Sequence, residues 1–64
     1  MCDFHVVMCQ GDNEKLIMEN VTELRVDGNG IFLKSLFDGQ KDLPATILRS
    51  IDFLANTVRL ERAS

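Results

Sequence analysis

Cysteine occupies the second position of this 64-residue chain, directly after the initiator methionine. Cysteine is small enough that the methionine before it can be removed, which would leave a free α-amine on Cys2. A free α-amine has a pKa of about 7.7 and a cysteine thiol one of about 8.5, so both can lose a proton to a metal ion near neutral pH. The nitrogen and the sulfur of this one residue would then close a compact chelate ring.

Two such chains would offer two nitrogens and two sulfurs to one metal ion. A tetragonal set of nitrogen and sulfur ligands suits Ni(II) or Cu(II) better than a tetrahedral zinc site does. A free cysteine is equally compatible with a role as a small apolar residue that binds nothing. The residues alone leave both interpretations of Cys2 open.

His5 and Cys9 are the other residues near the N-terminus with metal-binding chemistry. Seven steps of an extended strand separate Cys2 from Cys9 by roughly 23 Å, so the two thiols share neither a metal ion nor a disulfide within one strand. We predict that Cys9 is a buried apolar residue. His5, three residues after Cys2, lies on the opposite face of a regular strand. We predict a surface or packing role for His5 and retain it as a second candidate metal ligand.

The remaining motifs exclude several classes of function. The chain has no CxxC motif, no phosphate-binding glycine loop, and a single histidine outside any nucleophile–base pattern, so no enzyme active site is predicted. Its 7 Lys and Arg are scattered singly among 10 Asp and Glu, giving a net charge of −3. Nucleic acid is therefore an unlikely partner, because phosphate contacts need a basic surface.

The N-terminal residues also bear on where the protein works. Asp3 and His5 interrupt the apolar pattern of a secretory signal, and no stretch approaches the roughly 20 apolar residues of a membrane span. Two cysteines without an export signal favour a reducing compartment. These features predict a cytoplasmic protein that does not contact a membrane.

Apolar residues recur with a period of two along most of the chain, which is typical of β-strands. Residues 27–30, with the sequence Asp-Gly-Asn-Gly, predict a tight turn inside a hairpin that runs from residue 21 to 36. Gly28 and Gly30 are expected to adopt backbone angles that cost other residues energy. Residues 11–13 predict a second turn, and residues 37–42 a polar loop that leads to Pro44.

The segment after Pro44 fits two patterns. Four apolar residues fall on one face of a helix: Ile47, Leu48, Ile51 and Leu54. The same segment also fits a strand at 48–53, a turn at 55–57 and a return strand at 58–61, which we favour because the neighbouring elements are short and β-like. The prediction is an all-β fold with a single domain at residues 1–64, a small antiparallel curled sheet or barrel of five to seven short strands.

Six short motifs follow one another along the chain: Met1-Cys2, residues 21–26 (VTELRV), Leu36-Phe37-Asp38, Pro44, residues 51–53 (IDF) and residues 58–60 (VRL). In this order and spacing they resemble the CooT family of small nickel-binding proteins. The resemblance implies a homodimeric β-protein that binds nickel through the second-position cysteine of each subunit, near the dimer axis. Family members are associated with nickel delivery to carbon monoxide dehydrogenase, and have also been labelled predicted RNA-binding proteins. Only Cys2 is carried over as a site residue.

These observations together predict a nickel-binding homodimer, a metallochaperone or nickel reserve for a nickel enzyme such as carbon monoxide dehydrogenase. One Ni(II) per dimer would be held by Cys2, and the protein would not be an enzyme. A domain this small buries only about 60% of the surface of its unfolded chain, so self-association is expected on size alone. The alternatives are a small β-barrel that binds RNA and a protein-interaction module.

Overall fold

The structure, a computed structural model, describes residues 3–63 and consists of strands and turns over that range. The strands are β1 Phe4–Gln10, β2 Asn13–Asp27, β3 Gly30–Ser35, β4 Gly39–Pro44, β5 Thr46–Asp52 and β6 Thr57–Arg62. The predicted all-β fold is confirmed. In residues 3–63 no helix has the length and hydropathy that a membrane crossing would require.

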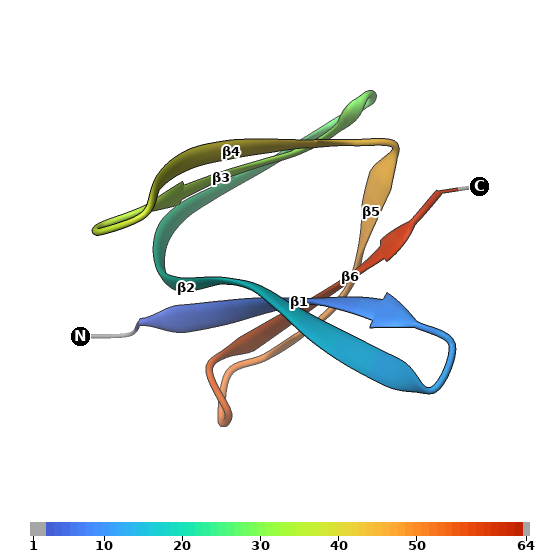
Figure 1. Cartoon of the computed structure of the whole chain (residues 1–64), viewed down its shortest axis with the longest axis horizontal. Helices are drawn as coiled ribbons and strands as arrows, with labels where there is room; N and C mark the ends of the chain where they lie inside the picture. Colours follow the sequence, from blue (N-terminus) through green and yellow to red (C-terminus); the bar gives the residue numbers. More distant parts are fainter. Residues whose placement is uncertain (1–2, 64) are drawn as a thin grey trace.

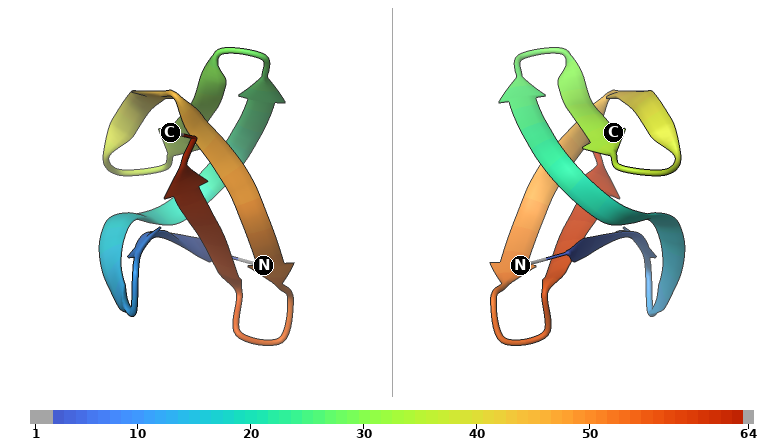
Figure 2. Two further views of the ribbon diagram at one scale, coloured as in Figure 1. Left: turned by 90° about the vertical axis from the view of Figure 1, so that its right-hand side faces the viewer. Right: turned by 90° about the vertical axis from the view of Figure 1, so that its left-hand side faces the viewer.

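All six strands belong to one sheet with the order β4-β3-β2-β1-β6-β5. The sheet is strongly curled (Figure 1), and β3 contacts β5 although the two strands are not neighbours in this order. Four of the five pairings are antiparallel, as predicted, whereas β6 runs parallel to β1. The parallel pairing places the β5–β6 hairpin beside the start of β1, at the end of the molecule where the chain begins (Figure 2).

The core lies on the concave side of the sheet, where alternate residues of the inner strands point inward. Val6 and Met8 of β1 are buried, while the residues between and beside them face outward. The complete buried apolar set is Val6, Met8, Met18, Val21, Ile31, Leu33, Val58 and Leu60. This alternation is the period of two that the sequence shows.

Strand β2 is a single long strand that bends at Asn20. Asn20 has a φ of 56°, in the left-handed region that asparagine tolerates better than most residues. Before the bend β2 pairs with β1, and after it with β3, and Val21 is a partner in both pairings. The bend therefore joins the two halves of the curled sheet.

The predicted β2–β3 hairpin is confirmed, but its turn differs from the expectation in one respect. Gly28 does not have a positive φ, whereas Gly30 has a φ of 154°. The Asp27 carboxylate closes the turn, since its Oδ1 accepts hydrogen bonds from the backbone N–H groups of Asn29 (2.7 Å) and Gly30 (3.0 Å). Of the two glycines of this turn, Gly30 is therefore the one at which the backbone requires glycine.

The polar loop predicted at residues 37–42 is wrong, because Gly39–Pro44 forms β4, an edge strand paired with β3. Only the short turn before it is irregular, and Ser35 holds that turn in place. Ser35 is buried, donates a hydrogen bond to the Glu19 carbonyl, and accepts from the N–H groups of Phe37 and Asp38. The turn is thus fixed to β2 while its own side chains remain exposed.

The two strands predicted after Pro44 are confirmed and the helical alternative is wrong. β5 and β6 pair antiparallel around a turn at residues 53–56. Ala45 alone separates β4 from β5, and its φ of 53° reverses the chain at that corner. Its N–H donates to the Asn29 carbonyl (3.0 Å), which ties the corner to the β2–β3 turn.

Candidate functional site

Cys2, the principal candidate ligand, lies outside the described residues. Strand β1 begins at Phe4, two positions further along the chain. Phe4 is therefore the first strand residue that follows Cys2 in the sequence.

His5 lies on the outer face of β1, next to the β5–β6 hairpin. Its side chain is exposed, and its backbone N–H donates to the Asn56 carbonyl over 2.8 Å. Its partner in β6 is Thr57, whose hydroxyl donates to the Ala55 carbonyl. His5 is thus a surface residue, as predicted, at the end of the sheet where the chain begins.

Cys9 is a free thiol at the opposite end of β1, and it is half-buried rather than buried as predicted. The reason is the strand period, because Cys9 lies on the outer face whereas Met8 beside it points into the core. Four steps along the strand lead from His5 to Cys9, a distance of about 13 Å. Strand β1 therefore does not bring these two side chains to one metal ion.

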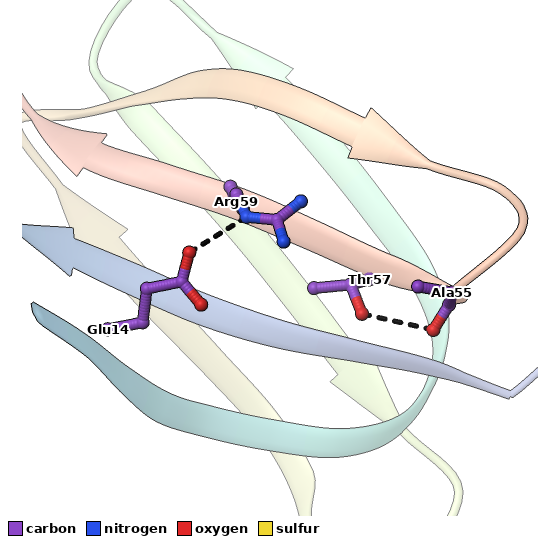
Figure 3. A network of polar contacts seen from close by, with 4 residues as sticks. All are labelled: Glu14, Ala55, Thr57 and Arg59. Carbon is purple, nitrogen blue, oxygen red and sulfur yellow. Dashed lines mark hydrogen bonds and ion pairs between the residues drawn. The ribbon is translucent and has the colours of Figure 1, made fainter.

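Charged residues surround Cys9 on the outer face. Its partners are Glu14 in β2 and Glu61 in β6. The Glu14 carboxylate is already paired with a positively charged side chain, because the Arg59 Nε donates a hydrogen bond to its Oε2 over 2.8 Å (Figure 3). The pKa of Arg59 is raised above its ordinary value, first by this hydrogen bond and then by the charge of Glu14.

No group of three or more His, Cys, Asp or Glu side chains in the described part of the chain could hold a metal ion.

A second ion pair joins Arg25 to Glu23, and the Arg25 guanidinium also lies over the Phe32 ring, 5.9 Å from its centroid. The outer face of β2 and β6 thus carries paired charges rather than a basic stripe.

An apolar groove of about 290 Å³ lies beside the first residue of β1. Its apolar lining consists of Phe4, Val21, Leu24, Ile51, Phe53 and Val58. The rings of Phe4 and Phe53 meet edge to face with centroids 6.0 Å apart. We call this feature, with the adjoining Leu54, the apolar groove. It was not predicted, because its residues come from β1, β2, the β5–β6 hairpin and β6, and no local pattern joins them.

Comparisons with known proteins give a consistent result. The family described as CO dehydrogenase accessory protein CooT matches residues 1–61. The chain belongs to the CooT family. The crystal structure described as a CooT from Carboxydothermus hydrogenoformans superimposes with a TM-score of 0.87 at 24% sequence identity, covering 98% of this chain and 100% of that one. A comparison with curated proteins finds no match.

The family match confirms the resemblance to CooT and gives the chain a role related to carbon monoxide dehydrogenase, as an accessory protein. The similarity to the Carboxydothermus CooT shows that the two share the curled β-sheet. The matched range begins at the first residue, so it includes the segment that carries Cys2.

Proposed function

We propose that this CooT-family chain is a cytoplasmic nickel-binding homodimer, which serves as a metallochaperone or nickel reserve and not as an enzyme. Its client would be a nickel enzyme such as carbon monoxide dehydrogenase. The observation that carries the proposal is the family match, which covers residues 1–61 and names an accessory protein of that enzyme. Cys2 would bind the nickel, one Ni(II) ion for each pair of chains.

The proposed ligands are the Cys2 thiolate and a nitrogen, either the α-amine left by removal of Met1 or the adjoining backbone amide. A soft thiolate combined with nitrogen suits Ni(II). In one chain a single cysteine offers too few donors for a tetragonal site, so the second copy supplies the other sulfur and nitrogen. Nickel is the cargo in this account, and the site must both bind it and release it.

The position of Cys2 suits metal transfer. The residue precedes β1, and the first buried residue of that strand is Val6. A metal bound ahead of the first strand can therefore be exchanged without opening the core. His5 lies closer to this end than Cys9 does and stays a second candidate ligand.

The proposal is tested by titrating the reduced protein, with its N-terminal methionine removed, with Ni(II). We expect an absorption band from thiolate-to-nickel charge transfer that saturates at one nickel per two chains. Saturation at one nickel per chain would contradict the shared site, and the absence of the band would contradict the thiolate ligand. A chain extended by residues before Met1 is the control, because it has no α-amine on Cys2 and is expected to bind nickel more weakly.

A further inference from the structure

We propose that Asn29 is a site of spontaneous deamidation, in which the Gly30 backbone nitrogen attacks the Asn29 side chain, and that the Asp27 carboxylate restrains this reaction while the β2–β3 turn is closed. The inference goes beyond the proposed function and is independent of it, since the reaction needs neither a metal ion nor a second copy of the chain. It gives residues 27–30 a chemical property in addition to their role as a turn.

The reaction needs no partner other than water. The Gly30 nitrogen gives up its proton to solvent and attacks the Asn29 Cγ, a succinimide ring forms, and the side-chain nitrogen leaves as ammonia. Water then opens the ring at one of its two carbonyl carbons. Opening at the Cγ gives aspartate, and opening at the former backbone carbonyl gives isoaspartate. The net change replaces an amide by a carboxyl group, with one water consumed, one ammonia released and no oxidation or reduction.

The sequence makes Asn29 the most reactive asparagine of the unfolded chain. Of the four asparagines, Asn29 alone is followed by glycine. Glycine has no Cβ beside the attacking nitrogen, so the ring closes there with the least steric hindrance. The other three precede a residue that carries a side chain, and they are Asn13, Asn20 and Asn56.

In the folded chain the two reacting groups differ in accessibility. Asn29 is exposed, whereas Gly30 is buried at the start of β3. The Gly30 N–H donates to the Asp27 Oδ1 over 3.0 Å, and the same oxygen accepts from the Asn29 N–H over 2.7 Å. Hydrogen bonds to a carboxylate are stronger than those between neutral groups. Because the Gly30 nitrogen must lose this proton before it attacks, the closed turn slows ring formation.

The modified turn is unable to keep its native contacts. A succinimide has no N–H at position 30, so the hydrogen bond from Gly30 to Asp27 is lost when the ring forms. In isoaspartate the main chain is one methylene longer, and the former Asn29 carbonyl belongs to a carboxylate outside the main chain. In the native turn that carbonyl accepts from the Ala45 N–H over 3.0 Å.

The damage would extend beyond the turn, because Ala45 connects it to the end of the chain. The Ala45 carbonyl accepts from the Ala63 N–H over 2.9 Å, directly after β6. Loss of the Asn29 contact therefore loosens the corner between β4 and β5 and its tie to residue 63. Chains modified at Asn29 carry one further negative charge, so anion exchange separates them, and we expect them to melt at a lower temperature than unmodified chains.

Mass spectrometric peptide mapping of the full chain, incubated in mildly alkaline heavy-oxygen water, tests the inference. The heavy oxygen marks deamidation that occurs during the incubation. In guanidinium chloride, Asn29 should deamidate at least about tenfold faster than the other three asparagines and at least about tenfold faster than in the folded parent. Folded Asp27→Ala should deamidate at Asn29 about tenfold faster than the folded parent, as for loss of one hydrogen bond to a charged group.

Gly28→Ala is the matched control in the same turn. A Cβ at Gly28 meets no atom within 4 Å, and the substitution leaves both hydrogen bonds of Asp27 in place, so the Asn29 rate should stay within about twofold of the parent. Asp27→Ser guards against a loss of folding in Asp27→Ala. Its hydroxyl still offers an acceptor oxygen, although a weaker one, and a smaller rise of about threefold is expected. Circular dichroism of each variant shows whether the sheet is intact.

Three results would overturn the inference or part of it. If Asn29 in the unfolded chain reacts no faster than the other three asparagines, it is not a modification site. If it reacts equally fast in the folded and the unfolded parent, the closed turn does not restrain it. If Asp27→Ala and Asp27→Ser, both folded, react at the rate of the parent, the Asp27 carboxylate is not the restraint.

Discussion

Replacing Cys2 by serine is expected to weaken Ni(II) binding about a hundredfold or more and to remove the charge-transfer band. A serine hydroxyl keeps its proton at neutral pH and is a harder, weaker donor to nickel than a thiolate is. The substitution changes one atom in a residue that precedes β1, so the fold is expected to remain intact. Isothermal titration with Ni(II), combined with circular dichroism, measures both properties on one sample.

Cys9→Ser is the matched control for this variant, and His5→Ala tests the second candidate ligand. Cys9 is half-buried at the far end of β1, so Cys9→Ser should lower the stability only slightly and leave the nickel affinity unchanged. His5 is exposed, and a loss of nickel affinity in His5→Ala would identify it as a ligand beside Cys2, whereas an unchanged affinity would leave it a surface residue. A hundredfold loss in Cys9→Ser, with Cys2→Ser unchanged, would move the site to the other end of the strand.

Gly30→Ala is expected to lower the free energy of unfolding by about 2 to 4 kcal/mol, a large part of the stability of a domain this small. A Cβ at Gly30 would lie 2.3 Å from the Leu43 carbonyl oxygen and 2.9 Å from the Pro44 Cα. Both atoms belong to the backbone of β4, which pairs with β3 at this point, so they cannot move aside as the end of a flexible side chain could. The φ of 154° adds strain for any residue with a side chain.

Gly28→Ala in the same turn is the control. A Cβ at Gly28 meets no atom within 4 Å, and we expect a change within about 0.5 kcal/mol. Thermal melts of both variants should be recorded at one protein concentration, because dimerisation makes the melting temperature depend on concentration. Equal melting temperatures for the two variants would show that β4 does not approach Gly30 as closely as described.

The two hairpins in which apolar residues alternate could be predicted from the sequence. The β2–β3 hairpin has a strong local turn signal at residues 27–30, and in β6 the apolar residues Val58 and Leu60 alternate with the charged residues Arg59 and Glu61. Strand β4 could not be predicted in this way, because its residues Gly39–Asp42 are polar and exposed. An edge strand with both faces in water needs no apolar alternation, and pairing with β3 alone defines it.

The arrangement around the candidate site was less accessible to prediction. The parallel pairing of β1 with β6 joins residues about 50 positions apart and has no local signal. The apolar groove follows from that pairing, since it brings Phe53 against Phe4. The prediction for Cys2 comes from its chemistry and its place in the sequence, not from the fold, and it stays a prediction.

X-ray absorption at the nickel K-edge tests the central claim most directly, because it counts the sulfur ligands of the metal. The parent protein, loaded with one Ni(II) per two chains, is predicted to show two sulfur ligands per nickel together with nitrogen. Cys2→Ser, loaded with excess nickel, is predicted to show none. A nickel site with only nitrogen and oxygen ligands in the parent, or sulfur retained in Cys2→Ser, would contradict a site shared by two Cys2 thiolates.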